Sequence, residues 1–156
     1  MRKGFTLIEM VIVIAVIAIL AGLLVPMVGS ILSDAKVSAG KAECKQIATG
    51  IIRYSAKVGI FPLASGGSNV GYKNRAYVLS NYLSGKYVDG QIGYDPWNRY
   101  YSYWVPNRSY AVSGYPAVFY SDGPDRVNSS WSATLWRSGK FNGDDLGQIM
   151  GNPWGS

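Results

Sequence analysis

The residues from Met10 to Val28 read MVIVIAVIAILAGLLVPMV, nineteen positions without a charged side chain. Further apolar side chains extend this run back to Phe5. Because a hydrocarbon core about 30 Å thick needs roughly 20 helical residues, the segment 5–28 is long enough to span a bilayer. Two cations, Arg2 and Lys3, come directly before it. The positive-inside rule therefore predicts a cytoplasmic amino terminus, with the rest of the chain on the other side of the membrane.

Glu9 is an acid within the apolar region, where a carboxylate costs on the order of 3 kcal/mol and calls for a partner or a function. A secretory signal peptide is the competing interpretation, with the basic start followed by a small-residue cleavage site at Val37-Ser38-Ala39. Its apolar core would exceed the usual length and would contain this acid. The pattern therefore favours an apolar helix that is retained.

The stretch Lys3-Gly4-Phe5-Thr6-Leu7-Ile8-Glu9, followed by the apolar run, resembles the amino-terminal signature of type IV pilins and pseudopilins. The resemblance implies that a prepilin peptidase removes the leader, residues 1–4, by cutting after Gly4, and methylates Phe5. It also implies that the Glu9 carboxylate faces the terminal amine of Phe5 in a neighbouring subunit. Such an ion pair would fix the register of neighbouring subunits more than it would stabilise the filament, because the cost of desolvating the two charges cancels much of their attraction.

Pro26 lies inside the predicted helix, where it removes a backbone donor, and Gly22 weakens the same turn. We expect a kink or local loosening here, as the resemblance implies for assembled filaments; a proline simply tolerated in a membrane helix is the alternative.

Helical spacing continues beyond Val28 as an amphipathic pattern that predicts one helix from about Phe5 to about Lys57. Residues 5–28 form its transmembrane and filament-core half, and residues 29–58 its amphipathic half. Cys44 lies in the second half, where a small helix-face residue is the simplest interpretation and a functional thiol the alternative.

Residues 59–156 have the composition of a globular head, with eleven of the twelve tyrosines and all five tryptophans. The sequence predicts a loop over 66–69 and a short helix over 75–84. It predicts strands over 99–105, 110–113 and 117–120. The expected fold class is α+β, a long amino-terminal helix packed against a small antiparallel sheet with extended loops.

Two head motifs narrow the resemblance: Asp95-Pro96-Trp97-Asn98-Arg99-Tyr100-Tyr101 and Tyr120-Ser121-Asp122-Gly123-Pro124-Asp125. With Asp144-Asp145 they look like the major pseudopilin of type II secretion. Asn98 and Arg126 stand where that family has glycine, and the acidic segments are further apart than usual.

Four of the seven aspartates, at positions 122, 125, 144 and 145, lie in glycine-containing loops rich in the oxygen ligands that calcium prefers. From the residues alone, aspartates that cap surface turns are an equal alternative. The resemblance implies a structural calcium ion, with Asp125, Asp144 and Asp145 as carboxylate ligands and Ser121 as a contributor of carbonyl oxygen. Paired carboxylates of a glycosidase are disfavoured, because the sequence supplies no cleft.

The chain has no histidine and one cysteine, which excludes Ser/His and Cys/His nucleophile pairs and an internal disulfide. Its net charge of +6 is scattered, so nucleic-acid binding is not expected. We expect a non-enzymatic subunit that polymerises through its helix into a type II secretion pseudopilus. The alternative is a subunit of a surface type IV pilus serving adhesion, motility or DNA uptake.

The resemblance further implies the partners and the location of such a subunit. The partners are copies of the chain itself, minor pilins or pseudopilins, an inner-membrane assembly platform and the prepilin peptidase. The subunit would begin in the bacterial inner membrane as a single-pass protein with a periplasmic head, and then enter a periplasmic filament, or a surface filament in the case of a pilus.

Overall fold

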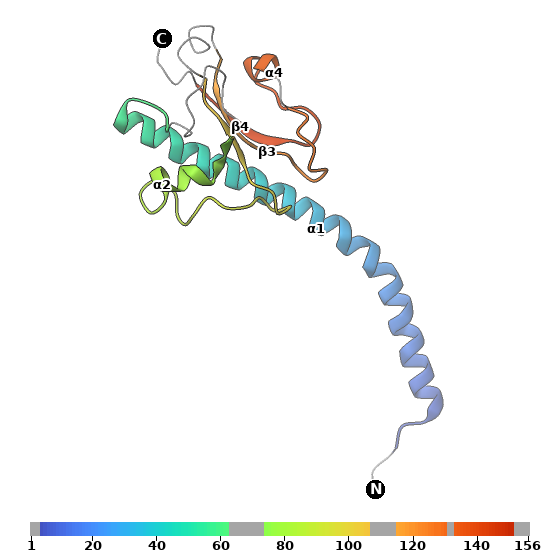
Figure 1. Ribbon diagram of the computed structural model, residues 1–156. Helices are drawn as coiled ribbons and strands as arrows, with labels where there is room; N and C mark the ends of the chain where they lie inside the picture. Colours follow the sequence, from blue (N-terminus) through green and yellow to red (C-terminus); the bar gives the residue numbers. More distant parts are fainter. Residues whose placement is uncertain (1–3, 63–73, 107–114, 131–132, 152–156) are drawn as a thin grey trace. The chain divides into compact units, whose positions relative to one another are not determined.

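The computed structural model describes residues 4–62, 74–106, 115–130 and 133–151 (Figure 1). The chain divides into two compact units, residues 1–35 and 36–156, which we describe separately. Helix α1, Leu7–Val58, contributes to both units.

The start of α1 is fixed by a capping box, a pattern in which the first and fourth residues of a turn bond reciprocally. The backbone N–H and the hydroxyl of Thr6 each donate to Glu9 Oε2 at 2.8 Å, and the Glu9 N–H donates to Thr6 Oγ1 at 3.3 Å. The helix ends at Val58, where Gly59 has φ +84° and donates its N–H to Ser55 O at 2.8 Å. The prediction of one helix over about 5–57 is confirmed within two residues.

In the first unit, the large apolar side chains of α1 are exposed from Leu7 to Leu32. Within the described residues, α1 is the one helix long and apolar enough to cross a membrane, judged by length and composition. Its backbone is helical through Gly22 and Pro26 without interruption. The predicted loosening at these two positions in a filament stays a prediction.

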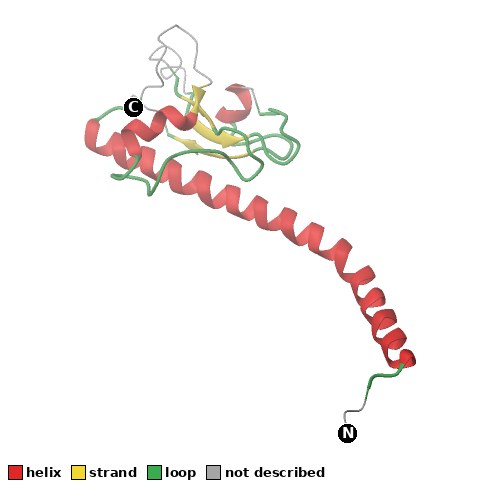
Figure 2. Ribbon diagram, turned by 60° about the horizontal axis from the view of Figure 1, so that its bottom comes forward, coloured by secondary structure: helices red, strands yellow, loops and turns green. Residues whose placement is uncertain are grey.

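The second unit contains a four-stranded antiparallel sheet with strand order β1-β2-β3-β4. The strands are β1, Asn74–Arg75; β2, Ser102–Trp104; β3, Ala117–Ser121; and β4, Leu146–Met150. The short helices are η1, Ala76–Leu79; α2, Ser80–Leu83; and α4, Ala133–Arg137. Figure 2 shows helical elements on either side of the strands.

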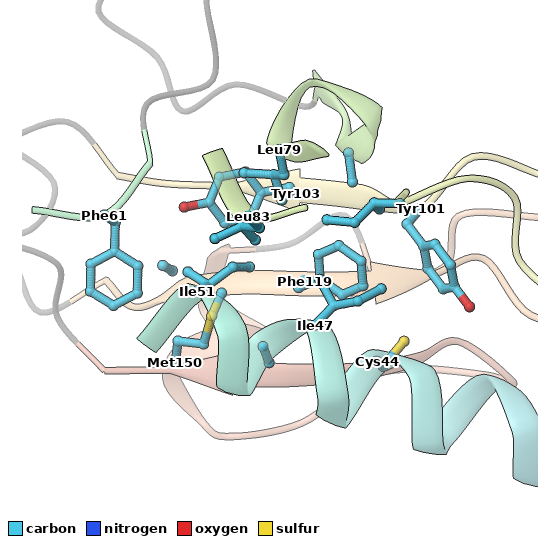
Figure 3. Packing of buried hydrophobic residues seen from close by; sticks show 14 of the residues in the cluster. Cys44, Ile47, Ile51, Phe61, Leu79, Leu83, Tyr101, Tyr103, Phe119 and Met150 are labelled. Carbon is cyan, nitrogen blue, oxygen red and sulfur yellow. The ribbon is translucent and has the colours of Figure 1, made fainter. Parts of the chain in front are cut away.

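Strand alternation divides the core of this unit between the two faces of the sheet. On one face, Phe119 and Tyr103 pack with the buried stripe of α1, Cys44, Ile47, Ala48 and Ile51 (Figure 3). Val118, Tyr120 and Trp104 belong to a second cluster on the other face, with Trp136 of α4. The α+β fold predicted from the sequence is therefore confirmed, including the helix packed against a small antiparallel sheet.

Most predicted elements of the head are present, and three additional ones were missed. The predicted helix over 75–84 contains η1 and α2, although its first residue, Arg75, belongs to β1. The predicted strand over 99–105 contains β2, and the one over 117–120 covers β3 except its last residue, Ser121. The loop predicted over 66–69 and the strand predicted over 110–113 lie outside the described residues. Sequence reasoning missed β1, α4 and β4, of which β4 matters most because the acidic pair Asp144-Asp145 directly precedes it.

Candidate functional site

The amino-terminal site consists of the predicted cleavage and assembly residues. Gly4 and Phe5 precede α1 and are exposed, Phe5 to 78 %. Glu9 lies in the first turn, where Thr6 binds its carboxylate. Sequence reasoning missed this capping role, although Thr6-Leu7-Ile8-Glu9 has the spacing of a capping box. The predicted pairing of Glu9 with a neighbour's Phe5 amine stays a prediction.

In the head, the first of the two motifs, residues 95–101, folds into a tight turn around Asp95. The buried Asp95 Oδ1 accepts the N–H groups of Trp97 at 3.1 Å and of Arg99 at 2.7 Å. Asn98 has φ +63° within this turn. Asparagine adopts the left-handed region more readily than most residues, so it can replace the expected glycine.

The second motif is joined to this turn by side chains. Ser121 Oγ donates to Asp95 Oδ2 at 2.5 Å, and Arg99 pairs with Asp122 at 3.1 Å. Arg126 donates to Trp97 O at 2.7 Å and has φ +61°. Both departures from the family pattern, Asn98 and Arg126, thus occupy the left-handed backbone conformation that favours glycine. The two motifs form one connected loop region in the second unit.

Of the predicted calcium ligands, Asp125 lies in the loop after β3, Asp144 and Asp145 lie in the loop before β4, and Ser121 is the last residue of β3. Asp144 Oδ2 accepts the N–H of Asp125 at 2.9 Å, while Asp125 Oδ1 accepts the N–H of Val127 at 2.7 Å. Asp145 Oδ2 accepts the N–H of Ser130 at 2.6 Å. Gly123 lies directly against the carbonyl group of Asp144. The fold therefore brings these segments together.

No group of three or more His, Cys, Asp or Glu side chains close enough to hold a metal ion occurs in the part of the chain that the structure describes. The Ser121 hydroxyl is engaged, because it donates to Asp95 and accepts the Gly123 N–H at 3.1 Å. The ligand set Asp125, Asp144, Asp145 and Ser121 stays a prediction, and an ion here would take neutral oxygens as well as carboxylates.

Cys44 and Glu43 lie beside the sheet on consecutive positions of α1. The Cys44 thiol is buried and donates to Leu146 O at 3.5 Å. Burial raises the pKa of the Cys44 thiol to about 12. Glu43 accepts a hydrogen bond from the hydroxyl of Tyr101. Both contacts anchor α1 to the head, and the environment of Cys44 is that of a structural rather than a reactive thiol.

Comparison with known proteins gives one match to the amino-terminal region and one to the rest of α1 and most of the head. Residues 1–25 match the family described as the prokaryotic N-terminal methylation motif. Residues 27–130, more than half of the chain, match the family described as type II secretion system (T2SS), protein G. Over 107 residues the chain is 32 % identical to the type II secretion system core protein G of Pseudomonas aeruginosa, covering 67 % of this chain and 75 % of that protein. No solved structure gives a significant match.

The methylation motif and the long apolar helix fit a membrane-anchored subunit of a type II secretion system. The match to the protein G family covers the second half of α1, the strands β1, β2 and β3, and the loop after β3 up to residue 130. The chain therefore belongs to the protein G family of type II secretion systems, a family of structural pseudopilins.

Proposed function

We propose that this pseudopilin polymerises through the first half of α1 into a periplasmic pseudopilus, whose growth moves exported proteins. The observation that carries the proposal is the exposure of the large apolar side chains from Leu7 to Leu32. In a monomer these apolar side chains would have to be covered by lipid. In a filament, the corresponding helices of neighbouring subunits would cover them instead. The role is therefore structural rather than catalytic.

The amino terminus supports a defined register for this packing. Cleavage after Gly4 would leave a methylated amine on Phe5, four residues before the Glu9 carboxylate. Pairing between the amine of one subunit and the carboxylate of the next would neutralise both charges in the apolar filament core. Because removing one partner of a buried ion pair costs about 3–5 kcal/mol, a misaligned neighbour would be disfavoured.

The proposed orientation places residues 1–4 in the cytoplasm and the head in the periplasm. Arg2 and Lys3 support it through the positive-inside rule. Cytoplasmic residues would then be available to a prepilin peptidase, and the helix to an inner-membrane assembly platform. Copies of the chain and minor pseudopilins would be the remaining partners.

A deletion strain tests the function against its nearest alternative, a surface type IV pilus. Loss of exoprotein release with surface pili intact supports the secretion pseudopilus, whereas loss of surface filaments with normal release supports the pilus. Restoring the gene should rescue the phenotype, and the mass of the native subunit should correspond to a chain that begins at methylated Phe5.

We also propose that a calcium ion stabilises the loops between β3 and β4. Their potential ligands are all oxygens, and Asp145 Oδ1 is buried without a hydrogen-bond partner, which is unfavourable unless something binds it. Asp125, Asp144 and Ser121 are the other ligands that the family resemblance suggests. A bound ion would supply positive charge that holds the two loops together.

Calcium dependence can be measured on the full chain in detergent. Chelation should lower the melting temperature and added calcium should restore it, because a ligand that binds only the folded state stabilises it. Equal melting temperatures with calcium and with chelator would refute the calcium proposal while leaving the filament proposal intact.

A further inference from the structure

Strand β4 forms one edge of the sheet, because the strand order is β1-β2-β3-β4. An edge strand presents backbone N–H and C=O groups to which another extended chain can pair. Charged side chains or proline often protect such an edge, and β4, with the sequence LGQIM, contains neither. Whether β4 can accept a further strand therefore depends on where its backbone groups point and on what borders the edge.

The pairing of β1 with β2 fixes the direction of the backbone groups across the sheet. The N–H of Ala76 donates to Tyr101 O at 2.8 Å, in continuation of the β1–β2 register. Tyr101, and Tyr103 two residues later, therefore direct their backbone groups toward β1. Tyr103 is also opposite Phe119 of β3. Because Tyr103 points away from β3, this pair is not hydrogen-bonded, and Phe119 directs its groups toward β4.

The same alternation identifies the outward groups of β4. Phe119 is opposite Gln148, so Gln148 is the hydrogen-bonded partner on β4. Its neighbours Gly147 and Ile149 consequently direct their N–H and C=O groups to the outer edge. Both residues are half-buried, and neither forms a backbone hydrogen bond at this edge with another described residue. Two N–H groups and two C=O groups are thus available to a fifth strand.

A groove of about 410 Å³ runs beside this edge, between β4 and α1. Lys41 and Lys45 of α1 contribute one wall. The other wall includes Phe141 together with Gly147 and Gln148 of β4. A strand added to the edge of β4 would therefore contact α1 as well as the sheet.

The groove has a positively charged side and an apolar side. Lys41 and Lys45 are exposed, lie one helical turn apart and form no ion pair with another described residue. Like charges at this spacing repel each other. Asp145, the remaining charged residue of the lining, is buried. Phe141 and Ile149 pack with the cluster on the face of the sheet away from α1, and both are only partly buried.

We propose that β4 binds an extended segment of another protein as a fifth strand, and that this segment alternates acidic and apolar side chains. Gly147 and Ile149 would supply the main-chain hydrogen bonds, while alternate side chains of the added strand point to opposite faces. Carboxylates on the α1 side would meet Lys41 and Lys45, and apolar side chains on the other face would meet Phe141. The inference does not depend on the proposed filament or on calcium.

A second copy that pairs through its own β4 fits this edge less well. Two identical edge strands pair about a two-fold axis, so the same surface of each copy meets the other. Both α1 helices would then lie on one side of the joined sheet, with Lys41 and Lys45 of each copy facing those of the other. Opposed like charges are destabilising, whereas an acidic segment is attracted.

Amide hydrogen exchange of the full chain in detergent, followed by NMR, tests the backbone pairing. The probe is a capped heptapeptide of alternating valine and glutamate. Its binding should slow exchange of the Gly147 and Ile149 amides at least about fivefold and leave Gln148, which already bonds to β3, unchanged. Unchanged exchange at the two outward amides would overturn the proposal. Protection that instead rises with the concentration of the chain, without peptide, would identify a second copy as the occupant and would also overturn it.

Methylated peptides provide matched controls for the strand geometry. Residues that form a hydrogen-bonded pair share one face of the sheet, so the valines of the probe would pair with Gly147 and Ile149. N-methylation of the valines should abolish the protection, whereas N-methylation of the glutamates, whose N–H groups point away from β4, should preserve it. Equal effects of the two modifications would contradict strand addition.

Charge reversal tests the chemistry of the partner. Lys41→Glu combined with Lys45→Glu should weaken binding of the glutamate peptide about tenfold and favour the peptide with lysine in place of glutamate. Arg53→Glu combined with Lys57→Glu is the control, because these residues are exposed on the same helix and do not line the groove. The control should change binding by less than about twofold, since salt screens distant charges. Equal weakening by both pairs, with melting temperatures unchanged, would contradict the assigned groove.

Discussion

At the residue scale, Gly123 joins the two acidic loops because it has no side chain. Its φ is +71°, and a Cβ atom at this position would overlap the carbonyl group of Asp144. Gly123→Ala should therefore destabilise the head by roughly 2 kcal/mol or more, combining backbone strain with a displaced loop. Chemical denaturation of the full chain in detergent measures the change.

Gly139→Ala is the matched control for Gly123→Ala. Gly139 has φ +75°, yet nothing lies within 4 Å of the position that a Cβ would occupy. The control should show the backbone strain alone, roughly 1 kcal/mol. Equal losses in the two variants would mean that the close approach of the loops contributes nothing.

Cys44 should make the head sensitive to alkaline pH. Burial raises the pKa of its thiol from 9.0 to about 12, so between these values the unfolded chain loses a proton that the folded chain keeps. The free energy of unfolding should then fall by about 1.4 kcal/mol per pH unit over this interval. Urea denaturation of the wild type and of Cys44→Ala between pH 8 and 11 isolates this contribution, because the other titrating groups are common to both. Parallel pH profiles would show that the thiol does not contribute.

The sequence identified several residues of the site but not the residues that they contact. Local sequence patterns reveal residue types and spacing, whereas contacts between distant segments depend on the fold. Asp144 and Asp145 were identified by the acidic motif, but the motif gives no reason to connect the loop before β4 with the loop after β3. That connection depends on the β3–β4 register. The capping role of Glu9 was visible in the spacing from Thr6, whereas the contact between Glu43 and Tyr101 joins residues far apart in the chain.

At the element scale, Gly50 tests how closely α1 packs against the loop that follows α2. In an exposed helix, Gly→Ala stabilises by up to about 1 kcal/mol. Here an added Cβ would overlap Val88 Cγ2 and lie 3.1 Å from the Tyr87 carbonyl oxygen. We expect Gly50→Ala to lower the free energy of unfolding by about 1–3 kcal/mol, the range for overpacking.

Thr49→Ala is the control, because Thr49 is an exposed neighbour on the same helix. Because alanine has a higher helix propensity than threonine, Thr49→Ala should leave the free energy of unfolding unchanged or slightly increased. If Gly50→Ala also increased stability, helix propensity would outweigh packing at this point and the close approach would be unimportant.

The elements differ in predictability for physical reasons. The helix α1 has a long apolar run, helical periodicity and Gly59 as a stop, so both ends were predicted within two residues. The strand β4, Leu146–Met150, contains Gly147 and Gln148 and has no clear alternation. Gly147 is required by packing rather than by strand propensity, because a Cβ would come within 2.6 Å of atoms in Phe141 and Tyr120. Such a contact between distant segments leaves little local signal.

At the scale of the whole molecule, Glu9 has a local role and a proposed intermolecular one. In the single chain its carboxylate accepts two hydrogen bonds from Thr6. In a filament the same charge would neutralise the Phe5 amine of a neighbour. Glu9→Gln keeps an oxygen acceptor for the cap and removes the charge, whereas Thr6→Val removes the capping hydroxyl and keeps the charge. The two substitutions therefore separate the roles.

We expect Glu9→Gln to reduce pseudopilus assembly at least tenfold, because the amine of the neighbouring subunit would be left without its counter-charge in an apolar core. Thr6→Val should weaken the helix start by about 1 kcal/mol and leave assembly within about twofold of the wild type. Filaments recovered from the periplasm after rupture of the outer membrane, quantified against total subunit, provide the measurement. Mass measurement of each variant must first show a processed, methylated amino terminus. Should Thr6→Val abolish filaments while Glu9→Gln assembles normally, Glu9 would act through the helix cap, and the pairing between subunits would have to be abandoned.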